Sequence, residues 1–323
     1  MKYGALVGGL ALAAAMLAPP ACGQEFPTGA IKIIVPVAPG GAADISARVI
    51  GQKLSEIFDQ PVVVENQPGA AGAIGMNTLR RAPPDGHTIG VVISLAQTID
   101  RIQNKQSSFD LTTDFTPITA IANNPAGLLV NAQVPSRTMT EFLAYAKAKP
   151  NELTCATAGI GTAHYLYGQV LNKVAGISLL NVPYRGTTLA FNDLLGGHVP
   201  AAIVSLATAL PQLANNQVRL LTVFDTKRYA KAPGVPAITE VLPQFEPGRT
   251  WIGFVAPRNL PGPIIARLHD EIVKILRMPG VVRILEENGL EIIANEPNEF
   301  ATMIREDSKI WVEAAVIAGL ITQ

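Results

Sequence analysis

The segment Pro36-Val-Ala-Pro-Gly-Gly-Ala-Ala-Asp44 carries the strongest fold signal in this chain. It follows a short apolar run, Ile31–Val35, that is typical of a buried strand, and it leads into a helical pattern with its apolar residues on one side. A strand, a glycine-rich turn and a helix start form an anion site, because the first-turn N–H groups lack partners inside the helix and lie at the positive end of its dipole. Gly40 and Gly41 have no Cβ, so a ligand can approach the backbone there. The spacing differs from the dinucleotide fingerprint GxGxxG, which predicts a small anion rather than a nucleotide.

The sequence leaves two roles open for Asp44. As the N-cap of the following helix it would accept a first-turn N–H and partly fill the anion site itself, and this interpretation is favoured because Asp is a preferred N-cap residue. Alternatively, its carboxylate could hold the ammonium group of an amino acid or a bridging water.

A second strand, turn and helix start occur later in the chain. The pattern predicts a strand at Leu153–Thr157, a tight turn at Gly159-Ile-Gly-Thr162 and a helix at Ala163–Val174 with Thr162 as its N-cap. If a hinge joins two domains that each carry one such turn, both helix N-termini can face a single carboxylate without an arginine. Ordinary capping chemistry is the alternative explanation of Gly and Thr at these junctions.

Short apolar runs alternate with helical periodicity along the chain, which predicts an α/β fold with mixed, mainly parallel sheets. The crossings near residues 120–130 and 220–226 predict a hinge of two strands. We therefore expect a signal peptide (1–23), a discontinuous first lobe (24–123 and 225–323) and a second lobe (124–224) inserted into it. The stretch Asn181–Gly186 places Tyr184 and Arg185 at a strand end, where α/β proteins hold ligands. Arg185 could equally be a surface charge, and Tyr184 could either line the cleft or pack in a loop.

The N-terminus predicts export to the periplasm. Lys2 precedes an uncharged apolar run, Gly4–Ala18, that is too short to span a bilayer comfortably, and Ala21-Cys-Gly23 offers small residues to a signal peptidase. We expect cleavage after Gly23. A lipid anchor on Cys22 is not expected, because the preceding Pro-Pro-Ala is a poor lipobox.

Composition excludes several classes of function. Without residues 1–23 the chain keeps 24 basic and 25 acidic residues, a net charge of −1 that attracts neither nucleic acid nor an anionic membrane. About 300 residues suggest two domains. Cys155 is then the single remaining cysteine, so no internal disulfide can form, and its apolar setting indicates a buried strand residue rather than a nucleophile.

Catalysis has little support in the sequence. The motifs HExxH, GxSxG and CxxC are all missing, so we expect no catalytic residue, no metal and no cofactor. His164 is the one histidine beside a candidate site, and a periplasmic hydrolase acting through Ser or Thr with His164 is an alternative. The histidines are His87, His164, His198 and His269.

Several separated motifs, in order, resemble the tripartite tricarboxylate transporter solute-binding proteins of the Bug or TctC type. The resemblance runs from about Phe26 to the C-terminus. It rests on IKIIVPVAPGGAADISARVIGQKLSE, QPVVVENQPGAAGAIG, APPDGHTI, TAGIGTAHYLYG, LLNVPYRGTTLAFNDLLGGHV and WIGFVAP.

The resemblance implies a periplasmic binding protein (type II-like) whose two α/β lobes close on a small carboxylate. In that family the Pro-Gly-Gly loop holds a carboxylate, partly through ordered water, and the opposing Gly-x-Gly-Thr turn and the turn after the third strand also line the pocket. The residues predicted to bind the ligand are Val37, Ala38, Pro39, Gly40, Gly41, Ala42, Asp44, Ser94, Leu95, Gly159, Gly161, Thr162, Ala163, His164, Tyr184 and Ser205.

Some residues depart from the family pattern. Val37 stands where many relatives have Phe, Ala43 where they have Thr or Ser, and Gln67 where they have Arg. Tyr165 replaces a common His, and the strand ending at Ser205 lacks the usual Asp or Asn. The pocket should therefore be less polar in places, which leaves a monocarboxylate, an aromatic acid or a dicarboxylate as candidate ligands.

The sequence thus predicts a monomeric receptor that traps a small organic acid by lobe closure and delivers it to the membrane subunits of a tripartite tricarboxylate-type transporter. A sensor that presents the same ligand to a signalling receptor is an alternative that sequence cannot separate. A transcriptional effector domain can share this architecture, but the export signal and the missing helix-turn-helix argue against it.

Overall fold

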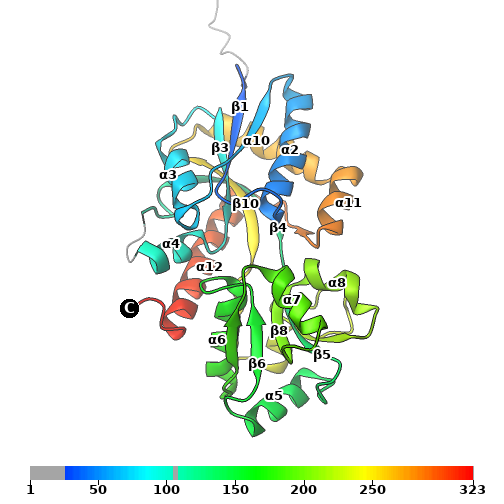
Figure 1. Cartoon of the computed structure of the whole chain (residues 1–323). Helices are drawn as coiled ribbons and strands as arrows, with labels where there is room; N and C mark the ends of the chain where they lie inside the picture. The colour runs from blue at the N-terminus through cyan, green and yellow to red at the C-terminus, as the bar shows by residue number, and fades with distance from the viewer. Residues whose placement is uncertain (1–25, 105–107, 323) are drawn as a thin grey trace, which may run out of the picture.

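The structure is a computed structural model that describes residues 26–104 and 108–322. The predicted signal peptide and Cys22 lie outside these residues. The described chain forms two α/β lobes, drawn one above the other in Figure 1. None of its described helices is long and apolar enough to cross a membrane.

The first lobe is built on a six-stranded sheet with the order β11-β4-β10-β3-β1-β2. Side chains of β1 alternate between two cores: Ile33 packs on the face that α2 and α10 cover, and Ile34 packs on the opposite face with α3 and α12. The strands are β1 (Ile31–Val35), β2 (Val62–Asn66), β3 (Thr88–Ile93), β4 (Phe115–Asn123), β10 (Trp251–Pro257) and β11 (Glu291–Ile292). The helices are α2 (Ala42–Phe58), η2 (Ala70–Gly72), α3 (Ala73–Arg81), α4 (Ala96–Asn104), α10 (Gly262–Leu276), α11 (Pro279–Glu287) and α12 (Pro297–Ile317).

The second lobe is built on a five-stranded sheet with the order β7-β6-β8-β5-β9. Cys155 of β6 faces α5 and α6, while its neighbour Ala156 faces α7 and α8. The strands are β5 (Ala126–Asn131), β6 (Thr154–Thr157), β7 (Leu180–Pro183), β8 (Ala201–Ser205) and β9 (Val218–Val223). The helices are α5 (Met139–Ala148), α6 (Ala163–Ala175), α7 (Thr187–Leu195), α8 (Leu206–Leu213) and α9 (Ile238–Val241).

Both sheets are mixed, as predicted, but parallel pairing does not dominate them. Each lobe has three parallel neighbours, β2-β1-β3 and β7-β6-β8. The strands next to the hinge pair in the opposite sense, since β10 runs antiparallel to β3 and β4, and β5 runs antiparallel to β8 and β9. The strands next to the crossings, β4, β10 and β5, thus pair antiparallel with all of their described neighbours.

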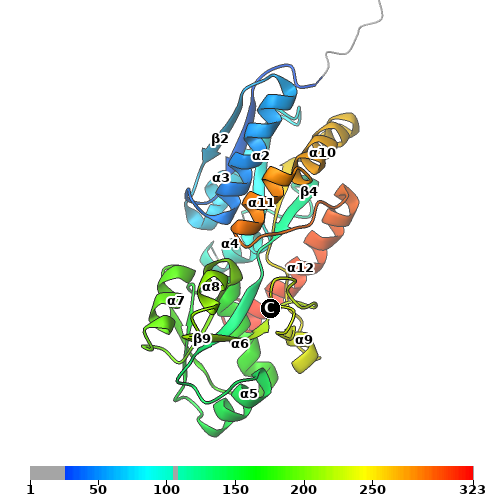
Figure 2. The same cartoon turned by 90° about the vertical axis from the view of Figure 1, so that its right-hand side faces the viewer.

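Two segments cross between the lobes. The first is the short link from β4 to β5, within the predicted 120–130 crossing. The second was expected near residues 220–226. Residues 226–247 lie mainly against the second lobe, where Ile238 of α9 and Phe245 are buried in its core (Figure 2), although Lys231 donates to the Glu286 carbonyl of α11 at 2.9 Å. The chain enters the first sheet at Trp251, next to Thr250, whose carbonyl accepts the Asn124 N–H at 2.9 Å. We therefore propose that the second lobe spans 124–247; the Pro-rich composition of 225–250 concealed its packing.

The last helix, α12, belongs to both lobes. Phe300 and Ile304 in its first half pack with Trp251 of the first lobe. Trp311 in its second half joins the core of the second lobe, where its ring lies 5.2 Å from that of Tyr167. Figure 1 shows this helix, in red, running along the junction. The two lobes are thus connected by two crossings and by one continuous helix.

Candidate ligand-binding site

In each lobe the turns that follow the parallel strands lie at one edge of the sheet. Because β1 pairs in parallel with β3, the turn before α2 and the Ser94–Leu95 turn are neighbours. Because β6 pairs in parallel with β7 and β8, the turns before α6, α7 and α8 are neighbours too. The carboxyl edge of such a sheet is where α/β proteins bind ligands.

These two edges meet at the hinge. Leu95 of the first lobe belongs to the same buried cluster as Ala163, the first residue of α6. A Cβ built on Gly161 would lie 3.7 Å from Ile102 Cδ1 of α4. The Ser94 N–H donates to the Trp251 carbonyl at 3.1 Å, and Ser205 Oγ donates to Asn124 Oδ1 at 2.7 Å. The structure thus brings the predicted residues Ser94, Leu95, Gly159, Gly161, Thr162, Ala163 and Ser205 to one region.

The β1–α2 turn leaves its backbone open. Gly41 is the N-cap of α2 and no side chain caps this helix, while Gly40 has φ +91°, a conformation that favours glycine. No heavy atom of the described residues lies within 4 Å of a Cβ built on Gly40 or Gly41. Ala38 and Pro39 are exposed, and Val37 is half-buried. A ligand can therefore reach the backbone of this turn.

The prediction of Asp44 as the N-cap is wrong. Asp44 is the third residue of α2, and its carboxylate reaches back to accept the Gly40 N–H at 2.9 Å and Asn66 Nδ2 at 2.9 Å. Arg48 donates from Nε at 3.0 Å and pairs through Nη2 at 3.0 Å. Burial raises the pKa of Asp44, but the hydrogen bonds from Arg48, Gly40 and Asn66 outweigh it and lower the pKa. The carboxylate is engaged within its own turn, so an ammonium ligand would compete with these partners.

The β6–α6 turn is closed by a neutral group, and Thr162 is confirmed as the N-cap of α6. Its Oγ1 accepts the Tyr165 N–H at 3.3 Å and donates to the Gly159 carbonyl at 2.7 Å. Gly159 has φ +125°, and a Cβ there would lie 3.1 Å from the Tyr184 carbonyl. A larger residue at position 159 would therefore have a strained backbone and would crowd this carbonyl.

Two other predicted residues, Tyr184 and His164, form no hydrogen bond with these turns through their side chains. Tyr184 donates from its hydroxyl to Asp193 Oδ2 at 2.6 Å, near the far end of α7, and this hydrogen bond raises the pKa of Tyr184 to about 12. His164 is half-buried, and its buried Nδ1 has no hydrogen-bond partner among the described residues. A hydroxyl–histidine pair is therefore not formed there. No cluster of three or more His, Cys, Asp or Glu in the described ranges is arranged to hold a metal.

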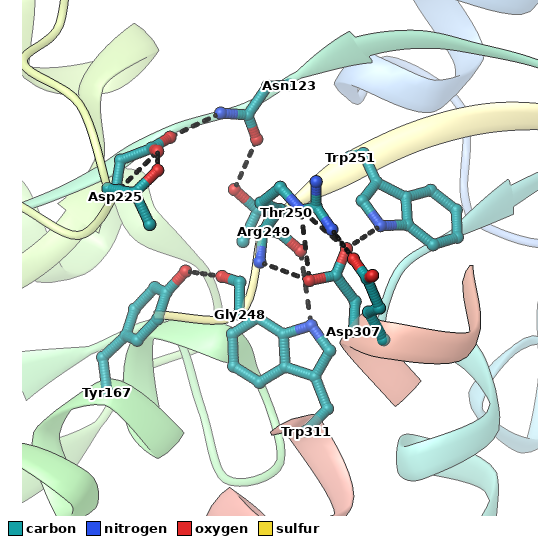
Figure 3. A network of polar contacts seen from close by, with 11 residues as sticks. Asn123, Tyr167, Asp225, Gly248, Arg249, Thr250, Trp251, Asp307 and Trp311 are labelled. Atoms are coloured by element: carbon teal, nitrogen blue, oxygen red, sulfur yellow. Dashed lines mark hydrogen bonds and ion pairs between the residues drawn. The ribbon is translucent and has the colours of Figure 1, made fainter. Parts of the chain in front are cut away.

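A polar network at the hinge was missed by the sequence analysis (Figure 3). Asn123 donates to Asp225 at 3.0 Å and accepts from Thr250 Oγ1 at 3.3 Å, so it links the two crossings. The Tyr167 hydroxyl donates to the Gly248 carbonyl and fixes the second crossing to α6. These contacts join residues that are far apart in sequence, and no local sequence motif marks any of them.

Asp307 is the centre of the same network. It accepts from Arg249 Nε at 3.0 Å and from Trp251 Nε1 at 2.8 Å, while Trp311 Nε1 donates to the Arg249 carbonyl at 3.3 Å. Burial raises the pKa of Asp307 although Arg249 and Trp251 act in the opposite direction. One signal could have revealed it: Asp307 lies on the apolar stripe of its helix, four residues before Trp311.

Comparisons with known proteins agree with this architecture. The family described as "Tripartite tricarboxylate transporter family receptor" (TctC) matches residues 46–319. A Pseudomonas sp. (strain P51) protein from the tcbD–tcbE intergenic region is 36% identical, over 91% of this chain and 87% of its own. An R. palustris structure with adipate is 28% identical, with TM-score 0.76 over 91% of this chain and 99% of its own. MatC from Rhodopseudomonas palustris with bound malate is 28% identical, with TM-score 0.73 over 90% of this chain and 99% of its own. The resemblance is confirmed, and the chain belongs to the TctC family of tripartite tricarboxylate transporter receptors.

Proposed function

We propose that this chain is a periplasmic receptor that captures a small organic carboxylate between its lobes and delivers it to the membrane subunits of a tripartite tricarboxylate-type transporter. The family match and the relatives with adipate and malate support a carboxylate ligand. The observation that carries the proposal is the packing of the β3–α4 turn against the β6–α6 turn. This contact turns the amide-bearing edges of both sheets toward each other.

The carboxylate would be held by backbone N–H groups at two helix starts. The N–H groups of Ala42 and Ala43 on α2, and of Ala163 and His164 on α6, have no acceptor among the described residues. Arg48 is occupied by Asp44 and Asn66, so charge at these turns comes from the helix dipoles. Each charge-assisted hydrogen bond of this kind contributes about 1.5–3 kcal/mol.

The walls of the region favour an acid with a hydrocarbon body. Ile160, at the tip of the β6–α6 turn, is 60% exposed, and Leu189, in the first turn of α7, is 50% exposed. Burying apolar ligand surface against such side chains contributes about 25 cal/mol per Å². We therefore expect a monocarboxylate or dicarboxylate with an apolar segment to bind better than a heavily hydroxylated tricarboxylate.

Closure of the lobes would bring the two turns onto one ligand, and the closed form is then the state that a transporter can recognise. In this proposal residues 1–23 direct export to the periplasm, the protein acts as a monomer, and the ligand leaves chemically unchanged. The hinge network of Asn123, Thr250 and Asp225 lies at the crossings about which the lobes would rotate.

Thermal denaturation of the chain 24–323 with a panel of organic acids tests this function. The panel holds adipate, malate, citrate, hexanoate and benzoate, with putrescine as a cationic control. A bound acid stabilises only the folded form, so it should raise Tm, and calorimetry should give one ligand per chain. The proposal fails if no acid raises Tm or if putrescine alone does.

A further inference from the structure

Unpartnered buried polar atoms are concentrated beneath the start of α6. Thr157 Oγ1, His164 Nδ1 and both amide atoms of Asn181 form no hydrogen bond with any described residue. Thr157 is fully buried, at 0% exposure. The other described side-chain atoms of this kind belong to single residues in separate elements: Ser46, Arg219 and Tyr229.

Strand register and helix spacing place these three residues on the facing surfaces of α6 and the β6–β7 pair. Asn181 pairs with Cys155 across β6 and β7, so Asn181, Cys155 and Thr157 share a face of the sheet. This face points toward α6, because Cys155 packs in the core that α6 covers. A Cβ on Gly168 would collide with Asn181 Oδ1, which shows that the amide lies against the helix. His164 is one helical turn before Gly168 and lies on the same side.

The side chains around the space between these surfaces suit a small neutral molecule that both donates and accepts hydrogen bonds. Burial lowers the pKa of His164 to about 4 and raises that of Cys155 to about 12, so both side chains are neutral at pH 7. The Asn amide and the Thr hydroxyl each offer a donor and an acceptor. An ion would find no compensating charge among these residues, whereas a buried water typically bonds two to four polar groups.

We propose that the space between α6 and the β6–β7 pair is an internal water site, in which at least one ordered water bonds Thr157, His164 and Asn181. This water holds the first turn of α6 against the sheet and so fixes the direction of the Ala163 and His164 N–H groups. The site does not depend on the proposed function, since it stands on the fold of the second lobe alone.

Replacing one hydroxyl tests the site through the sign of the stability change. Thr157→Val keeps the shape of the side chain and removes its hydroxyl. If that hydroxyl bonds a buried water, the water loses a hydrogen-bond partner, and the midpoint of urea unfolding should fall. Thr222→Val is the matched control, since Thr222 is equally buried and donates to the Pro236 carbonyl at 3.0 Å. Ser46→Ala removes an isolated unpartnered hydroxyl and should leave the midpoint unchanged or raise it.

The fall in urea midpoint should therefore be similar in Thr157→Val and in Thr222→Val, and the urea m-value should stay unchanged in both. A midpoint that is unchanged or raised, as expected for Ser46→Ala, overturns the proposal.

A high-resolution crystal structure of the unsubstituted chain gives a test that does not depend on a variant folding. We expect a solvent peak about 2.7–3.2 Å from at least two of the four atoms. A direct hydrogen bond between His164 and Asn181 or Thr157, with no room left for solvent, overturns the water site.

Discussion

The two glycine-rich turns share the order strand, glycine and helix, but they are closed by different chemistry. The β1–α2 turn is closed by an ionised carboxylate, Asp44, whose charge is balanced by Arg48. The β6–α6 turn is closed by the neutral hydroxyl of Thr162. An acidic residue is therefore compatible with an anion site when a neighbouring cation balances its charge. The two turns should respond differently to substitution and to pH.

The largest effect is expected from Gly41→Val, which places a branched side chain on the open backbone of the first turn. Binding of a carboxylate should fall by at least about 100-fold, because ligand approach to the first-turn N–H groups is blocked, while Tm stays close to the parent value. Gly262→Val is the matched control at the start of α10, where the space around Cβ is also open. If calorimetry gave equal affinities for Gly41→Val and the parent, the ligand would not bind at this turn.

Asp44→Asn should destabilise the protein at pH 7 by about 2 kcal/mol, since a neutral amide replaces the buried carboxylate that accepts charge-assisted hydrogen bonds from Arg48 and from the Gly40 N–H. The pKa of Asp44 is lower in the folded chain than its usual 3.8, so its stabilisation is complete above that pH and is lost as pH falls through the folded value. Urea unfolding at pH 7 and pH 3 should therefore show a gap between parent and variant that narrows at pH 3. A gap of constant size would contradict this assignment.

Thr162→Ala should lower stability by about 1 kcal/mol through loss of the cap, and it should also weaken ligand binding. Thr138→Ala is a close control, because Thr138 caps α5 in the same way by accepting the Glu141 N–H at 3.2 Å. Both variants should lose similar stability by urea unfolding, but affinity should change in Thr162→Ala alone. Equal affinity losses would show that the effect comes from general destabilisation.

The smallest effect is expected from Arg185→Gln. Arg185 is exposed on the turn before α7 and forms no ion pair with any described residue, so it can attract an incoming anion without holding it. Stopped-flow binding should show an association rate a few-fold lower and less dependent on salt, with dissociation unchanged. Arg283→Gln on α11 should leave both rates unaltered, and a slower association there would indicate a field from the whole protein instead.

Features set by local pattern could be predicted from the sequence. The bounds of β1 and β8 follow from short apolar runs next to turn residues. The role of Thr162 follows from its residue type and its place between the glycine turn and the helical pattern. The family and the two-lobed fold could also be predicted, because several motifs occur in the right order.

Features set by distant partners could not be predicted. α2 begins at Ala42, three residues earlier than an Asp44 cap would require, and the Asp44 carboxylate accepts from Asn66 on the next strand. The hinge contact between Asn123 and Thr250 joins residues 127 positions apart, so no local window contains it. No sequence pattern indicates that His164 Nδ1 would be buried without a hydrogen-bond partner among the described residues, because that depends on how α6 packs on the sheet.

The position of Trp311 has a consequence for the order of folding. The stacked rings of Tyr167 and Phe224, 4.5 Å apart, are covered by a residue close to the end of the chain. A ribosome or a secretion channel releases Trp311 only after Tyr167 and Phe224, so these two rings stay uncovered until α12 has been made. Contacts of such long sequence separation slow folding, and the exposed apolar surface favours aggregation until they form. We therefore expect a chaperone to bind the surface that α12 later covers.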